Sequence, residues 1–330
     1  MTVNQLVTIS EAVSLIEEGK PLLFAGVEPL LDQLPRGNWI GGTIPYFMTH
    51  QGGVYDTSHV FVNRLPDEFI VESARFYTAS EISQVNVNGP EDGMSFVVMP
   101  YKSDVHTVFA QDAPSFDRYL LHPLIGWVAG IDLSAKGEQA PKVYLGTEGR
   151  ANAEDAVVMH CSMPGNFRVL IDIVNVFEPD VQSDSIRFEK GGFSAKVAFV
   201  NGERVSFARY LEDNKINTAL PMVADFYGAR INLSFKSVDS ARETVLFYTP
   251  VIERVTYRLA KVVDDYEAAF ERNTPKGLED ILFSCNCILN YRHAHLEGKT
   301  LGVLTGPFTF GEIAYQLVNQ TLVYAVVEKR

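Results

Sequence analysis

The sequence predicts a mixed α/β protein, with a strand–helix–strand unit near each end and a strand-rich, largely antiparallel middle; an α+β arrangement is the alternative. Two observations carry this prediction. Short apolar runs border segments of helical spacing at both ends, whereas apolar and polar residues alternate in the middle. With 330 residues, 46% of them hydrophobic, the chain can bury a large core. We expect two halves, 1–150 and 151–330, that pack as one unit.

The N-terminal unit follows an amphipathic helix. Thr8 and Glu11 have the spacing of a capping box, which predicts where this helix begins. The apolar run Leu22–Gly26 predicts a buried strand, and the helical spacing over 27–34 predicts a second helix before Pro35. Residues 39–44 then predict a second strand. Because a helix joins the two strands, they should pair in parallel.

A similar unit closes the chain. We expect a strand over 281–285, a helix over 287–296 and a strand over 301–304. Phe24-Ala25-Gly26 parallels Phe283-Ser284-Cys285, which raises the hypothesis of an ancient duplication.

The middle of the chain carries alternating patterns. Asn201-Gly202 predicts a type I′ hairpin turn between strands over 193–200 and 203–210. The other expected elements are a central strand over 169–176, a strand over 231–235, a helix over 264–272 and a helix from residue 313.

Charge and composition exclude several classes of partner. Lys and Arg number 28 against 41 Asp and Glu, a net charge of -13, which disfavours nucleic acid and anionic lipid. The amino terminus lacks the pattern of a signal peptide, and no apolar run is long enough to span a bilayer. Three cysteines do not make a disulfide framework. We therefore expect a cytoplasmic protein.

The segment 306–313 is the richest in potential ligand-binding groups. Glycines permit close approach to a ligand, and the Thr309 hydroxyl and the Glu312 carboxylate supply directional polar groups. We predict that it shares one pocket with residues near the ends of other strands. The predicted ligand-binding residues are Gly41, Gly42, Thr43, Cys285, Thr309, Gly311, Glu312 and Asn319. The structural alternative is a tight turn in which Glu312 caps a following helix.

These residues also carry a family resemblance. Gly-x-x-Thr-x-Gly-Glu-Ile from Gly306, followed by Asn319-Gln320-Thr321, resembles the end of the FIST sensory domain. Phe283-Ser284-Cys285 and Gly41-Gly42-Thr43 are similar to further FIST motifs, so the likeness covers about residues 22–62 and 278–327. The whole chain also resembles an uncharacterised bacterial family.

The resemblance implies a sensor of small ligands, with amino acids suggested, and some FIST proteins look like haem-based nitric oxide sensors. Two positions depart from the FIST pattern. Ile288 stands where an Arg is usual, and Ala314-Tyr315 follow where Pro is frequent. If that Arg binds an anionic group, this chain must use another residue or another ligand.

Other reactive residues give weaker patterns. Cys285, Cys287, His293 and His295 lie close in sequence, but their spacing does not direct all four to one metal ion. His160 and Cys161 are adjacent in a predicted strand, so they should point to opposite faces and His160 should not activate Cys161. The remaining histidines, His50, His59, His106 and His122, have no partner at a recognisable spacing. Neither a dinucleotide motif nor a P-loop is present.

The leading interpretation is a small-ligand-binding sensory protein without an attached output domain, so that its signal passes to a separate signalling protein. The first alternative is a haem- or metal-binding gas or redox sensor that uses one of the histidines. The second is an enzyme with Glu312 as acid or base and Cys285 as nucleophile. The sequence leaves the oligomeric state and the identity of the ligand open.

Overall fold

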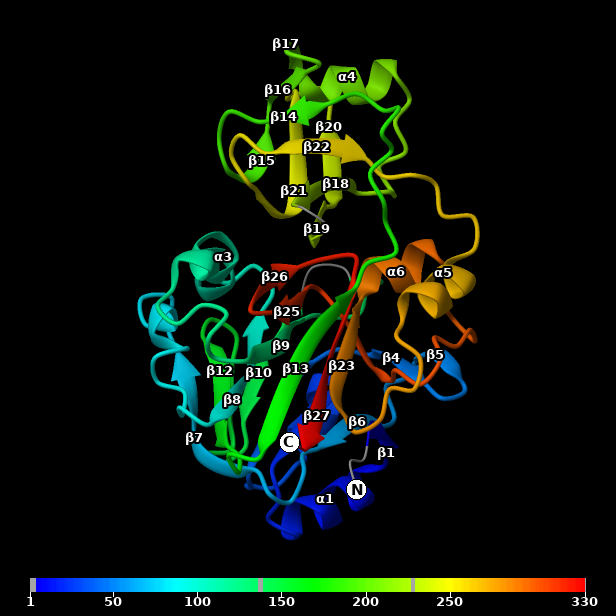
Figure 1. Cartoon of the computed structure of the whole chain (residues 1–330). Helices are drawn as coiled ribbons and strands as arrows, with labels where there is room; N and C mark the ends of the chain where they lie inside the picture. The colour runs from blue at the N-terminus through cyan, green and yellow to red at the C-terminus, as the bar shows by residue number, and fades with distance from the viewer. Residues whose placement is uncertain (1–3, 136–138, 227–228, 330) are drawn as a thin grey trace. The chain divides into compact units, whose positions relative to one another are not determined.

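The computed structural model describes residues 4–135, 139–226 and 229–329, which are mixed α/β and rich in strands (Figure 1). Contacts divide the chain into two units. Unit 1 comprises Met1–Val174, Thr274–Leu317 and Leu322–Arg330, and unit 2 comprises Asn175–Asn273 and Val318–Thr321. The expected boundary between residues 150 and 151 lies inside unit 1. Both terminal strand–helix–strand units belong to unit 1 as well.

Unit 1 contains three six-stranded sheets, named here in their strand order. Sheet I is β1 (Asn4–Val7), β6 (Val60–Arg64), β2 (Leu22–Gly26), β3 (Trp39–Thr43), β10 (Val143–Leu145) and β11 (Arg150–Asn152). Sheet II is β7 (Ile70–Tyr77), β12 (Ala156–Ser162), β8 (Gly93–Pro100), β9 (Leu124–Ala129), β25 (Glu312–Ala314) and β26 (Gln316–Val318). Sheet III is β13 (Phe167–Val174), β27 (Leu322–Lys329), β23 (Ile281–Cys287), β24 (Gly306–Thr309), β4 (Tyr46–Thr49) and β5 (Gly52–Tyr55).

The three sheets repeat one topology. Each contains a single parallel pair, β2–β3, β8–β9 or β23–β24, and each first strand of a pair also lies against an antiparallel strand. Each sheet ends in two strands that follow the parallel pair of another sheet in the chain. Strands β4 and β5 follow β3 but complete sheet III, β10 and β11 follow β9 but complete sheet I, and β25 and β26 follow β24 but complete sheet II. This cyclic exchange ties the three sheets into one body.

One glycine marks the same position in each parallel pair. A Cβ on Gly41, Gly126 or Gly306 would lie 2.5, 1.8 or 1.9 Å from the backbone oxygen of Phe24, Val97 or Ser284, respectively. Because Gly41 approaches Phe24 and Gly306 approaches Ser284, Phe24 and Ser284 occupy equivalent positions in their sheets. The expected parallel between Phe24 and Phe283 is therefore shifted by one residue. The structure also contains a third strand–helix–strand unit, formed by β8, α3 (Asp104–Asp112) and β9, that the sequence analysis missed.

Short helices connect these strands. Helix α1 (Ile9–Glu17) begins with the predicted capping box, in which Thr8 Oγ1 accepts from Glu11 N (3.3 Å) and Glu11 Oε2 accepts from Thr8 N (2.8 Å). Helix α3 packs Val105 and Phe109 onto sheet II. The other helical segments of unit 1 are α2 (Glu28–Leu31), η1 (Ile82–Gln84), α3 (Asp104–Asp112), η2 (Ala113–Ser115) and α6 (Ile288–His293).

Unit 2 has two antiparallel sheets around an aromatic core that includes Phe188, Phe207 and Phe247. The first sheet is β17 (Glu203–Ser206), β16 (Val197–Val200), β14 (Ile186–Arg187), β22 (Thr256–Leu259), β18 (Met222–Phe226) and β19 (Ala229–Leu233). The second is β15 (Gly192–Ala195), β21 (Thr244–Val251) and β20 (Phe235–Asp239). Its helices are α4 (Phe207–Asp213) and α5 (Tyr266–Asn273).

Several expected elements are confirmed. Strands β2 and β3 pair in parallel, as do β23 and β24. Asn201 and Gly202 join β16 to β17 with φ values of 50° and 90°, as a type I′ turn requires.

Other expected elements are wrong. The helix expected from residue 313 is instead the strands β25 and β26, because both extend sheet II beside β9. The strand expected over 301–304 forms later, as β24. The strand expected over 203–210 changes to α4 at Phe207, and the one over 231–235 is split between β19 and β20. The expected central strand over 169–176 is β13, at the edge of sheet III beside β27 (Figure 1).

Candidate functional site

Three of the predicted ligand-binding residues meet in unit 1. Glu312, Thr309 and Cys285 are all buried, and Thr309 Oγ1 lies 3.4 Å from Glu312 Oε1. The same hydroxyl contacts the backbone oxygens of Gly311 (3.0 Å) and Asn286 (3.3 Å). Cys285 Sγ lies 3.6 Å from the Gly126 oxygen. Burial raises the pKa of the Cys285 thiol well above its usual value, and the nearby Glu312 carboxylate raises it further.

Trp127 is an aromatic neighbour of this cluster on strand β9. It stands directly opposite Glu312 in the β9–β25 ladder, so the two side chains lie on the same face. The indole is 1% exposed, and within the described part of the chain its Nε1 has no hydrogen-bond partner. A Cβ on Gly42 would lie 3.4 Å from this nitrogen and 2.6 Å from Val98 Cγ1. Gly42 therefore permits close packing beside Trp127.

The remaining predicted residues of unit 1 have backbone roles. Thr43 Oγ1 donates to the Gly130 oxygen (2.8 Å) and accepts from Lys142 N (3.0 Å), so it joins the end of β3 to the segments after β9 and before β10. The Gly311 oxygen accepts from Val128 N (2.8 Å). Gly41 allows β3 to approach β2.

Asn319 lies apart from these residues, in unit 2. It accepts from Ser234 Oγ (3.2 Å) and donates to Thr249 Oγ1 (3.3 Å). Asn232 donates to the backbone oxygens of Asn319 and Gln320, both at 3.2 Å. These bonds hold the segment Val318–Thr321 within unit 2.

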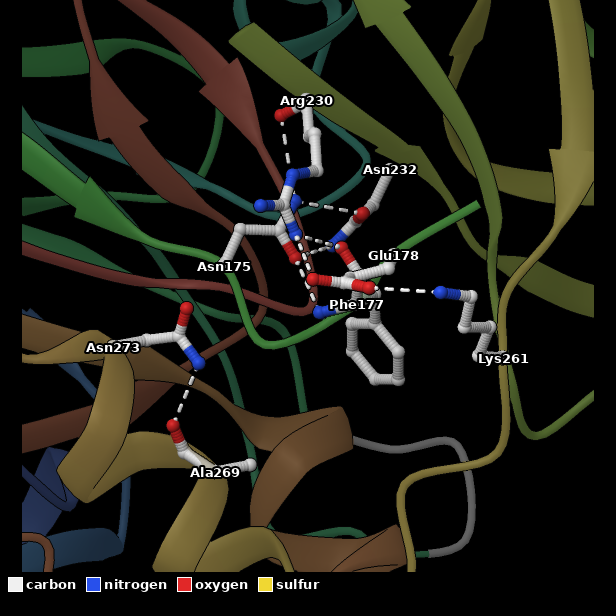
Figure 2. Close-up of polar contacts among 8 residues, drawn as sticks. All are labelled: Asn175, Phe177, Glu178, Arg230, Asn232, Lys261, Ala269 and Asn273. Atoms are coloured by element: carbon white, nitrogen blue, oxygen red, sulfur yellow. Dashed lines mark hydrogen bonds and ion pairs between the residues drawn. The ribbon is translucent and has the colours of Figure 1, made fainter. Parts of the chain in front are cut away.

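Figure 2 shows the polar contacts that continue from Asn232. Asn175 and Asn232 exchange amide hydrogen bonds of 2.9 and 3.2 Å, and Asn175 Nδ2 also donates to the Arg230 oxygen (3.3 Å). Glu178 lies between the cations of Arg230 (3.6 Å) and Lys261 (3.0 Å). The amides of Asn175 and Asn232 bond one another and nearby backbone, and the Asn319 amide bonds the hydroxyls of Ser234 and Thr249, which indicates a structural role for Asn319.

A second polar cluster, on the opposite face of sheet II, was missed by sequence analysis. We call it the Ser95 chain: Asn88, Tyr77, His160, Ser95 and His122 in hydrogen-bonding order. The contacts are Asn88 Nδ2 to Tyr77 Oη (3.1 Å), Tyr77 Oη to His160 Nε2 (2.7 Å), His160 Nδ1 to Ser95 Oγ (2.6 Å), and Ser95 Oγ to His122 Nε2 (2.6 Å). Tyr77, His160, Ser95 and His122 are each no more than 1% exposed.

The elements of sheet II position these side chains. Ser95 and His160 are opposite one another in the β8–β12 ladder. His122 comes from the loop before β9, where Ser95 N donates to the Pro123 oxygen (2.9 Å). Two residues of that loop, Arg118 and Leu120, have φ of 58° and 62°. Side chains other than glycine rarely adopt this conformation, and such strain is concentrated at functional sites.

Both histidines of the Ser95 chain are neutral near pH 7. Burial lowers the pKa of His122 to about 4; the Arg118 charge adds to this, and the Pro90 carbonyl opposes it. Burial likewise lowers the pKa of His160 to about 4, with smaller contributions from His122 and Arg75. A neutral imidazole can accept a proton from a hydroxyl, so the arrangement provides a serine beside a potential base.

The cysteines do not have the surroundings of a reactive thiol or of a metal site. All three cysteines are free and buried, and burial raises the pKa of Cys161 to about 12. A thiol with a raised pKa is a poor nucleophile at neutral pH. Across residues 4–135, 139–226 and 229–329, no three His, Cys, Asp or Glu side chains gather as metal ligands would. In the same ranges, no helix has the length and apolar character needed to cross a membrane.

Comparison with known proteins assigns the chain to a family. A model described as "Family of unknown function (DUF6976)" matches residues 7–328. The chain belongs to the DUF6976 family. No curated protein matches it. The DUF6976 match extends over both units and does not assign the chain to the FIST domain, so the FIST resemblance stays a prediction from the sequence motifs.

Only two residues of the Ser95 chain, Ser95 and His160, stand out in the sequence. Ser95 and His160 are polar residues inside apolar strands, which is a pattern that marks buried polar groups. No sequence spacing connects either residue to His122, because the β8–β9 pairing places the loop that carries His122.

Proposed function

We propose that this chain is a small-ligand-binding sensory protein that recognises an amine-bearing molecule, such as an amino acid, beside Glu312. The observation that carries the proposal is the buried Glu312 carboxylate with the Trp127 indole N–H directly across the ladder, a donor with no acceptor among the described residues. An ammonium group would complement the carboxylate, and a ligand oxygen would accept from Trp127 Nε1. An amino acid offers both groups in one small molecule.

The chemistry of burial supports this ligand class. A buried donor without an acceptor costs about 1–3 kcal/mol. A ligand oxygen that accepts from Trp127 Nε1 would remove this cost, and the Glu312 carboxylate across the ladder would favour a ligand with a positive charge.

The position of Glu312 in the chain supports a sensory role. Glu312 begins β25, and the strands β25 and β26 run directly into Val318–Thr321, which belongs to unit 2. The cluster is closed in this structure, so a ligand would enter when β25 shifts from β9. Such a shift would act on a segment of chain that unit 2 holds through Asn232. The resemblance of this segment to the end of the FIST domain agrees with the proposal.

The test is a thermal-shift screen of the full chain against the twenty amino acids and simple primary amines. A ligand at 100 times its dissociation constant adds about 2.7 kcal/mol of stability. For a domain of 150–250 residues this corresponds to roughly 5–10 °C in Tm.

Glu312→Gln is the decisive variant, with Glu328→Gln, an exposed position on β27, as the matched control. Glu312→Gln should abolish the ligand-induced shift while the Tm of the free protein stays within a few degrees, because an amide of the same shape removes a buried charge. If Glu312→Gln lowers the Tm of the free protein strongly and any ligand shift persists, Glu312 serves the turn and the proposal is wrong.

A further inference from the structure

We infer that Ser95 is a second, covalent site: a serine nucleophile for acyl esters that residues 86–90 cover in this structure. The inference does not depend on the proposed function, because the Ser95 chain and Glu312 lie on opposite faces of sheet II. It rests on the direction of the hydrogen bonds and on the contacts of the cover.

One direction of the hydrogen bonds gives every hydroxyl of the Ser95 chain an acceptor. With the Asn88 amide nitrogen donating to the Tyr77 oxygen, the buried Tyr77 hydroxyl has an acceptor in the chain when it donates to His160 Nε2. Neutral His160 then carries its proton on Nδ1 and donates to Ser95. The Ser95 hydroxyl is left to donate to His122 Nε2.

In this order of hydrogen bonds, the Ser95 hydroxyl donates its proton toward His122 Nε2, which can act as a base. The same order also places the proton of neutral His122 on Nδ1, a buried nitrogen, and the Pro90 carbonyl acts on this imidazole as a hydrogen-bond acceptor. A nucleophile bonded to a base, with neighbouring groups that fix its proton, is the arrangement used in nucleophilic catalysis. His160 and Tyr77 act here as positioning residues.

A short cover separates the Ser95 chain from solvent. Arg118 Nη1 donates to the backbone oxygens of Asn86 and Gly89, both at 3.2 Å. Gly89 lies so close to His122 that a Cβ there would be 2.2 Å from Nε2. Val87 and Asn88 of the same segment are exposed. Besides the Asn88–Tyr77 bond and the bond from Asn88 N to the Gln84 oxygen (2.9 Å), the two Arg118 bonds hold the cover, so breaking them would loosen it beside His122 and Ser95.

The proposed reaction is the hydrolysis of an ester by water, with Ser95 as nucleophile and His122 as base. Ser95 Oγ attacks the acyl carbon, its proton passes to His122 Nε2, and the C–O bond to the leaving alcohol breaks as the alcohol takes up that proton. Water then attacks the acyl-serine with His122 again as base, which releases the carboxylic acid and restores Ser95.

The test is labelling of the full chain with an alkyl fluorophosphonate, followed by peptide mass spectrometry. Ser95 Oγ would displace fluoride from phosphorus and keep a stable phosphonyl group. We expect labelling at Ser95, its loss in Ser95→Ala, and its retention in Ser73→Ala, which removes an exposed serine on β7, the strand that β12 separates from β8. Arg118→Ala should raise the labelling rate at least fivefold, because it frees the cover.

A second variant keeps the test valid if Ser95→Ala does not fold. Ser95→Cys retains a nucleophile, and the introduced thiol should react with iodoacetamide faster than Cys161, which is buried in the neighbouring strand. The inference is overturned if a cooperatively melting wild-type protein and Arg118→Ala both remain unlabelled at Ser95. Labelling that persists undiminished in folded Ser95→Ala would overturn it as well.

Discussion

Acidification should destabilise unit 1 through the two buried histidines of the Ser95 chain. The pKa of His122 and that of His160 are about 4 in the folded protein, against an ordinary value of 6.5. Because the folded pKa is depressed, the unfolded chain binds more protons below pH 6.5. Their contribution to stability is therefore complete above pH 6.5 and is lost as the pH falls toward 4.

The expected loss is large. Near pH 5 each histidine gains almost one proton on unfolding, which gives a slope of about 1.3 kcal/mol per pH unit per residue. Between pH 7 and pH 5 the pair should cost about 3–4 kcal/mol, a large fraction of a typical stability of 5–15 kcal/mol. Carboxylates with lowered pKa values, such as Asp132, contribute mainly below this window.

Urea unfolding at pH 5, 6, 7 and 8 measures this effect. Both tryptophans of the chain, Trp39 and Trp127, belong to unit 1, so their emission reports that unit. His122→Gln should remove about half of the pH dependence between pH 7 and 5. His50→Gln, at an exposed position, should leave it unchanged. His293, whose pKa burial also lowers, adds the same trend to every variant. If the free energy of unfolding of His122→Gln depends on pH as strongly as that of the wild-type protein, the reasoning is refuted.

Three further substitutions test the fold. Gly126→Ala should cost at least about 1–3 kcal/mol in urea unfolding, because the new Cβ would meet the Val97 oxygen, whereas Gly165→Ala has open space and should be neutral. Thr8→Ala removes the cap of α1 and should cost about 0.5–2 kcal/mol; an unchanged urea midpoint would contradict the capping role. Asn232→Ala leaves the buried carbonyls of Asn319 and Gln320 without this donor, so hydrogen exchange at 318–321 should accelerate roughly tenfold or more.

Local chemistry made some elements predictable from sequence. The capping box at Thr8 and the turn at Asn201-Gly202 depend on a few adjacent residues, and both formed as expected. The strands Leu22–Gly26 and Trp39–Thr43 followed from apolar runs joined by a helical segment.

Long-range pairing decided the rest. Residues 313–318 have helical spacing, yet sheet II takes them as strands because β9 offers them an unpaired edge. The cyclic exchange of strands among the three sheets depends on contacts between distant segments and leaves no local pattern. In the candidate site, Glu312, Thr309 and Cys285 meet as their motifs suggested, whereas Asn319 lies in unit 2. The partners of Ser95 come from three separate segments, which no sequence spacing connects.

Tryptophan fluorescence tests the central claim, ligand recognition beside Glu312, most directly. In Trp39→Phe, Trp127 is the only remaining tryptophan and reports on its own surroundings. Titration with an amino acid that raises the Tm should change the Trp127 emission saturably, with a midpoint equal to the dissociation constant. The same titration of Trp39→Phe combined with Glu312→Gln should give no change. A ligand that raises the Tm of both proteins while the Trp127 emission stays constant would show that it binds elsewhere.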